Sequence, residues 1–135
     1  MARDTESGAQ AAQDLTRNLT LLTDLYQLTM MSGYLKNGKQ NDLAVFDLFF
    51  RRNSVITYSV AAGLEQALAY IRGIRFTEED LAYLRSLGLF DEEFLAYLKG
   101  FRFTGDVYAV PEGTVVFPEE PILTVCGCLP ARMSA

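Results

Sequence analysis

One stretch near the N-terminus combines a helix start, an apolar stripe and an aromatic side chain: Leu19-Thr20-Leu21-Leu22-Thr23-Asp24-Leu25-Tyr26-Gln27-Leu28-Thr29-Met30-Met31. Asp24, followed three residues later by Gln27, has the spacing of a capping box, in which the carboxylate accepts free backbone N–H groups while the amide reaches back. Leucine and methionine then recur at helical spacing. The pattern predicts a helix from about Asp24 to Lys36 that stops at Asn37-Gly38.

Tyr26 falls in the first turn of this predicted helix, close to the positive end of the helix dipole and to unpaired N–H donors. Two interpretations stay open on spacing alone. Amphipathic stripes usually pack against a core, which makes Tyr26 a packing residue. A flat aromatic ring beside a helix N-terminus is also a plausible seat for a planar, anionic ligand, with Asp24 as the cap that supports it.

Composition bounds the class of protein. The chain has 135 residues, half of them hydrophobic, and a net charge of −5. This length and composition predict one domain with a packed core. The negative charge does not favour binding to nucleic acid or to an anionic membrane. The sequence has neither an apolar run of the ~20 residues that span a bilayer nor the apolar segment of a secretion signal, so we expect a cytoplasmic protein.

The two cysteines, Cys126 and Cys128, are separated by one residue. That spacing is too close for an ordinary disulfide between them, and two thiols cannot complete a four-ligand zinc site in a chain without histidine. We interpret them as incidental and predict no metal ligands, in keeping with a reducing compartment.

A short apolar strand is predicted from Leu43 to Phe50, and a second from Val55 to Val60 that would pair with it as a hairpin. A strand that is apolar on both faces is usually covered on both sides. Arg51 and Arg52 follow the first strand. A double arginine at a strand end is either a solvated edge or an anion clamp, since guanidinium groups match phosphate and carboxylate oxygens.

The rest of the chain predicts helices followed by strands. One helix is expected from Leu64 to Arg72, and two shorter ones open at Thr77 and Asp91, where acidic residues favour caps rather than catalysis. From Phe101 the apolar period changes to two, which predicts a meander of antiparallel strands at 101–103, 107–110, 114–117 and 121–125. The fold class is therefore α+β.

Five segments, in order, carry a resemblance: Thr23-Asp24-Leu25-Tyr26-Gln27-Leu28-Thr29-Met30, Phe50-Arg51-Arg52-Asn53, Ala62-Gly63-Leu64-Glu65-Gln66-Ala67-Leu68, Gly105-Asp106-Val107-Tyr108-Ala109-Val110-Pro111-Glu112-Gly113 and Pro118-Glu119-Glu120-Pro121-Ile122-Leu123-Thr124-Val125. Together they resemble the N-terminal part of nicotinate phosphoribosyltransferase, over residues 19–125. Ser54 stands where the family usually has proline, which affects the loop after the arginines.

The resemblance implies the N-terminal domain of a type II phosphoribosyltransferase, with the C-terminal α/β barrel missing. The family joins nicotinate to phosphoribosyl pyrophosphate, with Mg²⁺ accompanying the pyrophosphate and ATP hydrolysis coupled through a phosphorylated histidine. It is a glycosyltransferase that is also classed as a ligase. By resemblance, Tyr26 stacks on nicotinate, and Arg51 or Arg52 contacts the phosphates of the donor. The site is implied to lie between the subunits of a homodimer.

The two ends of the chain depart from this pattern. Residues 1–18 have no apolar period and are predicted to form a flexible tail. Residues 126–135 match neither periodicity, and they replace the family's usual continuation after Val125, as a frameshift or truncation would. We therefore expect the isolated chain to make no nicotinate mononucleotide. The alternative function is a catalytically inactive domain that acts at most as an oligomerisation partner.

Overall fold

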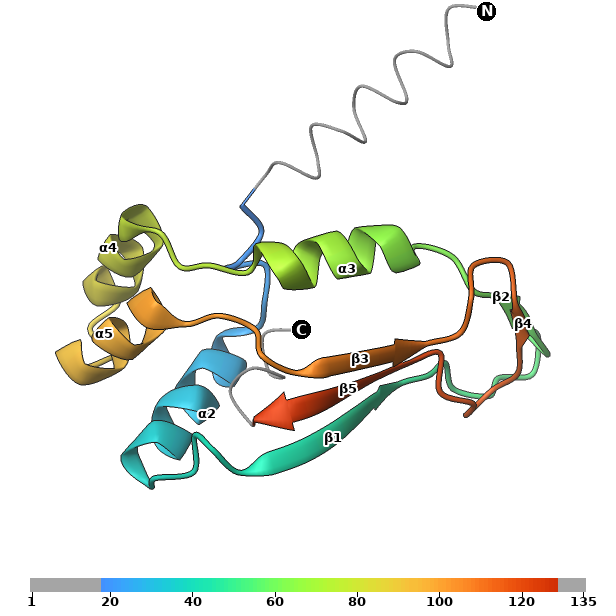
Figure 1. The fold of residues 1–135 in the computed structure, drawn as a ribbon, viewed down its shortest axis with the longest axis horizontal. Helices are drawn as coiled ribbons and strands as arrows, with labels where there is room; N and C mark the ends of the chain where they lie inside the picture. The colour runs from blue at the N-terminus through green and yellow to red at the C-terminus, as the bar shows by residue number, and fades with distance from the viewer. Residues whose placement is uncertain (1–17, 129–135) are drawn as a thin grey trace, which may run out of the picture.

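The computed structural model describes residues 18–128, and its helices and strands come in separate runs along the chain, which is an α+β order (Figure 1). This confirms the predicted fold class. The elements are α2 (Leu25–Lys36), β1 (Leu43–Leu48), β2 (Ser59–Val60), α3 (Leu64–Gly73), α4 (Glu78–Ser86), α5 (Glu92–Gly100), β3 (Asp106–Ala109), β4 (Val115–Val116) and β5 (Leu123–Cys128). Figure 1 shows α2, α4 and α5 grouped at one end, the β2–β4 pair at the other, and α3 lying over the strands between them.

The larger sheet has three antiparallel strands in the order β1-β5-β3. β5 is the central strand: Leu43 pairs with Cys128 and Leu48 with Leu123 on one side, and Asp106 pairs with Cys126 on the other. β4 pairs with β2 in a separate two-stranded sheet. The strands are antiparallel as predicted, but their neighbour order is not that of a meander, because β4 leaves the sheet between β3 and β5.

Three strand predictions are corrected by the structure. The segment 55–60 does not form a hairpin with β1: only Ser59–Val60 is a strand, and its partner is β4, while the Asn53 side chain accepts the N–H groups of Val55 and Ile56 before it. Residues 101–103 form no strand. The last strand continues to Cys128, three residues past Val125, because backbone pairing with β1 extends that far and does not depend on the side-chain pattern.

The main core lies among the helices rather than on the sheet. Its largest fully buried side chains are Phe94, Met31, Leu84, Leu95 and Leu98. Phe90 and Phe94 have ring centroids 5.2 Å apart, and Phe76 meets Phe101 edge to face at 6.0 Å. Leu81 and Leu84 of α4 and Leu95 and Leu98 of α5 are all buried in this core, so both helices pack by an apolar face.

Both short helices begin at the predicted caps. The Thr77 hydroxyl accepts the Asp80 N–H while the Asp80 carboxylate accepts the Thr77 N–H, which completes a capping box. Asp91 accepts the Phe94 N–H at the start of α5. The acidic residues at these positions thus satisfy helix ends, as predicted.

The prediction that the first strand is covered on both sides is wrong for the described part of the chain. Leu43 in β1 is 82% exposed and Val45 is 64% exposed. Phe46 and Leu48, on the opposite face of the strand, are also exposed. The helices pack mainly against one another, so residues 18–128 leave this apolar strand open.

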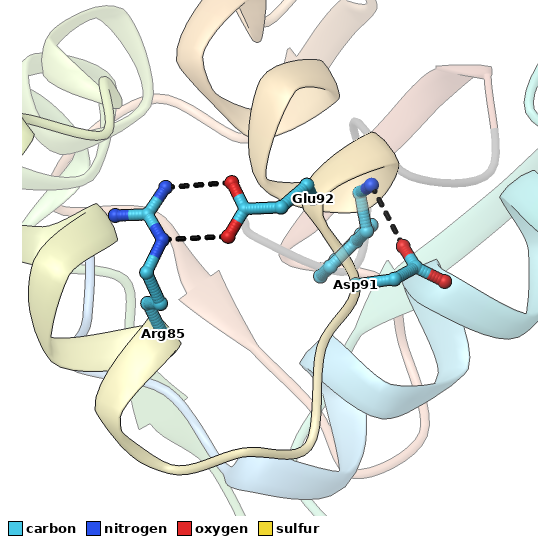
Figure 2. Close-up of polar contacts among 4 residues, drawn as sticks. Arg85, Asp91 and Glu92 are labelled. Carbon is cyan, nitrogen blue, oxygen red and sulfur yellow. Dashed lines mark hydrogen bonds and ion pairs between the residues drawn. The ribbon is translucent and has the colours of Figure 1, made fainter.

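Two ion pairs tie the helical end together (Figure 2). The Lys36 ammonium at the end of α2 lies 2.8 Å from the Asp91 carboxylate at the start of α5. Arg85 of α4 forms a two-pronged contact with Glu92 of α5, at 2.7 Å and 2.8 Å. The bond from Lys36, followed by that from the Phe94 N–H, lowers the pKa of Asp91, and the bond from Arg85 lowers the pKa of Glu92.

Because its pKa is lower in the folded chain, the Asp91 carboxylate stabilises the fold above its unfolded pKa. That contribution is lost as the pH falls through the folded pKa. When the pH is lowered from about 7 to about 3, the thermal midpoint of the Asp91→Asn variant should fall less than that of the unchanged chain. The reason is that asparagine can still cap the helix but carries no charge to lose. Glu93→Gln, two residues further on in the first turn of α5, is the matched control and should keep the full fall. Coincident profiles for Asp91→Asn and the unchanged chain would contradict the prediction.

Candidate functional site

Tyr26 lies on the surface in the first turn of α2, with 58% of its side chain exposed. The buried side of this helix is formed instead by Leu28, Met31 and Ser32. Of the two interpretations left open by the sequence, core packing within the described chain is therefore excluded. The ring is available to a ligand or to another polypeptide.

The predicted capping box at this helix does not form. Asp24 is the N-cap residue by backbone conformation, but its side chain makes no capping hydrogen bond. The Thr23 hydroxyl donates to the Gln27 side-chain oxygen. The Gln27 amide, which was expected to reach back to Asp24, is therefore engaged with Thr23 instead. Thr23 is itself a good local partner for that amide, and Asp24 contributes through its backbone carbonyl, which accepts the Gln27 N–H.

Arg51 and Arg52 are exposed and follow the end of β1 after Phe49 and Phe50. The 119–122 segment holds the backbone just before them: the Phe50 carbonyl accepts the Glu119 N–H at 2.9 Å, and the Leu48 carbonyl accepts the Ile122 N–H at 2.8 Å. The turn at Asn53 then reverses the chain without the proline that the family usually has at position 54. The arginines thus extend from a fixed backbone, which is what an anion clamp requires.

Glu112 joins the motif segment 105–113 to the motif segment 62–68. This role was not predicted from the sequence. Gly63 adopts a positive φ of 96° at the N-cap of α3 and has no side-chain oxygen with which to cap the helix. One Glu112 carboxylate oxygen accepts the N–H groups of Gly63 and Leu64, at 2.9 Å and 2.8 Å. The Gly113 N–H also donates to the Ala61 carbonyl. The turn before β4 is therefore locked to the start of α3.

Four of the five motif segments meet at one end of the larger sheet through these contacts, and the fifth does not. The arginine segment contacts the 118–121 turn, Val110 donates to Ile122, and Glu112 reaches α3. Tyr26 belongs to α2, at the end of the molecule where β1 begins, whereas Arg51 and Arg52 follow the opposite end of that strand (Figure 1). The structure therefore groups the arginines with the other motifs but does not bring Tyr26 to them.

The cavity that the described residues form at these motifs is not a complete substrate site. The one at the junction of the four motifs, beside Glu112, is about 70 Å³ and mainly apolar, well below the roughly 300–1,000 Å³ of small-molecule sites. A larger cleft of about 390 Å³ lies elsewhere, between α5 and the end of β5. The motif residues can therefore contact the edges of a substrate, but within residues 18–128 they do not enclose one.

The described residues offer neither a cluster of metal-ligating side chains nor a helix that could span a membrane. Residues 18–128 contain no group of three or more histidine, cysteine, aspartate or glutamate side chains placed to hold a metal ion. No helix in the same range is both long and apolar enough to cross a bilayer.

The fold is that of a phosphoribosyltransferase N-terminal domain. The crystal structure of human nicotinic acid phosphoribosyltransferase matches it with a TM-score of 0.74 and 36% identity, over 83% of this chain and 23% of the human chain. The family model for the N-terminal domain of nicotinate phosphoribosyltransferase matches residues 21–133. The chain belongs to the nicotinate phosphoribosyltransferase family. The match extends eight residues past Val125, where the sequence had been expected to leave the family, and residues 129–135 lie outside the described range.

Curated relatives agree. Nicotinate phosphoribosyltransferase pncB2 of Mycobacterium tuberculosis is 50% identical over 102 residues, which are 75% of this chain and 22% of the relative. The Bacillus subtilis enzyme is 49% identical over 109 residues, 80% of this chain and 22% of its own. The chain therefore spans less than a quarter of the length of these relatives.

The Glu112 contact gives a prediction about α3. Glu112→Ala should lower the free energy of unfolding by about 1–2 kcal/mol, the usual cost of losing a helix cap, and should speed hydrogen exchange at the start of α3. Glu65→Ala, an acidic residue in the first turn of the same helix, is the matched control for simple attraction to the helix end. Equal losses in urea unfolding for the two variants would show that the two hydrogen bonds add nothing specific.

Proposed function

We propose that this chain supplies the N-terminal domain of a nicotinate phosphoribosyltransferase, which joins nicotinate to phosphoribosyl pyrophosphate. The products are nicotinate mononucleotide and pyrophosphate, the entry to NAD from the free acid. The family match supports the assignment. The observation that carries it is the assembly of four motif segments around the backbone that presents Arg51 and Arg52.

The chemistry assigns different tasks to the two groups of residues. Displacing pyrophosphate from the anomeric carbon requires charge stabilisation on the leaving group and a pyridine nitrogen aligned for attack. The exposed guanidinium groups of Arg51 and Arg52 suit the donor phosphates. The exposed ring of Tyr26 suits stacking on nicotinate, which holds the pyridine plane in position.

The separation of Tyr26 from the arginines supports a site completed by other polypeptide. In one copy, α2, which carries Tyr26, lies at the end of the molecule where β1 begins, whereas Arg51 and Arg52 follow the other end of β1. We propose that the site is completed by a C-terminal barrel in a homodimer, with Tyr26 contributing to the barrel site of the partner subunit. The exposed apolar side chains of β1 provide surface for such packing.

We do not assign the proposed cofactors Mg²⁺ and ATP to residues 18–128. Because residues 18–128 do not fit a metal ion, we assign no step to Mg²⁺ within this domain; the donor phosphates would carry it. The 135-residue sequence contains no histidine, so a phosphorylated histidine for ATP coupling would have to lie outside these residues. The net charge of −5 favours neither nucleic acid nor anionic membrane as a partner, and we propose a cytoplasmic setting.

A second function is favoured by one observation. The open apolar strand β1 suits a domain that associates with other subunits without catalysing the reaction itself. In that case the chain would act as an inactive oligomerisation partner.

The first test separates the domain from the catalytic assembly. The 135-residue chain alone, with nicotinate, phosphoribosyl pyrophosphate, Mg²⁺ and ATP, should form no nicotinate mononucleotide, because no described cavity at its motifs encloses a substrate. A chimera in which residues 19–125 replace the matching segment of the Bacillus subtilis enzyme should be active. An inactive but folded and dimeric chimera would favour the non-catalytic function, and turnover by the isolated chain would show that the barrel is dispensable.

The second test assigns the residues within an active chimera. Tyr26→Ala should raise the KM for nicotinate, with a loss of about 1–3 kcal/mol expected for an aromatic stack. Tyr83→Ala is the matched control, since Tyr83 is a helical tyrosine with 57% exposure. Arg51→Ala and Arg52→Ala should instead raise the KM for phosphoribosyl pyrophosphate, with the exposed Arg72→Ala as their control. Unchanged kinetics for Tyr26→Ala would remove it from the site.

A further inference from the structure

The structure places the two cysteines on the same face of a strand that pairing holds on both sides. Cys126 and Cys128 are alternate residues of β5, so their side chains project to one side of the sheet. β1 pairs with both residues, and β3 pairs with Cys126. Thr124 is the next residue on this face, and its hydroxyl donates to the Asp47 carboxylate directly across the pair. That contact confirms how the face is oriented.

Both thiols are free and partly exposed. Their closest neighbours across the sheet, Leu43 and Val45, are among the most exposed apolar residues of the chain. Cys128 also lines the cleft of about 390 Å³, beside Tyr97 and Arg102. Burial, and secondarily the proximity of Cys128, raise the pKa of Tyr97. Because both thiols are partly exposed and Cys128 lines this cleft, a small solute can reach the pair from solvent.

The strand geometry disfavours a disulfide within the pair. Alternate residues of a strand have Cα atoms about 6.6–6.8 Å apart, with parallel Cβ vectors, whereas a disulfide requires Cβ atoms about 3.5–4.5 Å apart. Closing the bond would pull β5 away from β1 and β3. The two sulfur atoms can instead approach a single ion held between them without moving the backbone.

We propose that Cys126 and Cys128 form a two-thiolate site for a soft, thiophilic cation, with monovalent copper as the ligand. Thiolates select soft ions of this kind. Zinc is excluded as the match, because it takes four protein ligands in structural sites and residues 18–128 gather no third cysteine, histidine or carboxylate with this pair. On binding, each thiol releases its proton to solvent as its S–Cu bond forms, and no electron is transferred.

The test is a competition between the reduced 135-residue chain and bicinchoninate for monovalent copper, without oxygen. The unchanged chain should bind one copper ion per chain. Cys126→Ser and Cys128→Ser should each weaken binding about 100-fold or more, because a two-point attachment becomes a single contact. Equal affinity in either serine variant, or one copper ion shared between two chains, would overturn the proposal.

Two double variants test the geometry while keeping two thiols. Thr124→Cys with Cys128→Ser restores a pair of alternate residues on the same face of β5, and should recover most of the affinity. Gly127→Cys with Cys128→Ser places the thiols on adjacent residues and opposite faces, and should not. Circular dichroism checks that each variant folds. If the Gly127→Cys, Cys128→Ser variant does not fold, the Thr124→Cys, Cys128→Ser variant is sufficient for the test. A folded Thr124→Cys, Cys128→Ser variant that does not recover copper binding would contradict a site defined by one face of the strand. The readout is copper affinity, so the result is independent of phosphoribosyl transfer.

Discussion

The carboxylate of Glu112 makes the contact on which the arrangement of the motifs depends. It accepts two N–H groups at the start of α3, where Gly63 provides the positive φ but no capping oxygen. This contact joins the 111–113 turn to the start of α3. The end of β1 is connected separately, because the Leu48 and Phe50 carbonyls accept the Ile122 and Glu119 N–H groups. Unpaired N–H groups at a helix start are costly to leave without partners. A single acidic residue thus links the cap of α3 to a turn far along the chain.

The helices could be predicted because their signals are local. Thr77, Asp80 and Asp91 lie within three residues of the groups they cap, and the leucine spacing of α4 and α5 follows one helical face. The order of the strands in the sheet could not be predicted, because β5 pairs with β1, a strand far away in the sequence. Glu112 was missed for the same reason, since it lies 49 residues from Gly63. Asp24 shows that a local signal also fails when a neighbour, here Thr23, offers the same amide a better partner.

The candidate site was predictable only in part, because Tyr26, Arg51 and Arg52 are exposed in the described chain and packing there does not define their roles. Sequence spacing alone favoured a packed Tyr26, and the structure instead places its ring in solvent. The open β1 strand shows the same pattern: its apolar sequence predicts cover, which the described helices do not provide. Both observations fit a chain that matches under a quarter of the length of its relatives. The core among α2, α4 and α5 explains how the domain can be ordered while its sheet remains open.

The pairing of β1 with β5 has a consequence for the time course of folding. The Asp47–Thr124 contact joins residues 77 positions apart, and the central strand of the sheet is the last one to be synthesised. Local helices form without waiting for distant partners, whereas a sheet of this topology must first close a long loop. During translation the helical core therefore forms first, and the apolar β1 strand remains unpaired until β5 has emerged. In that interval its free edge is the part of the chain most exposed to aggregation and to chaperones.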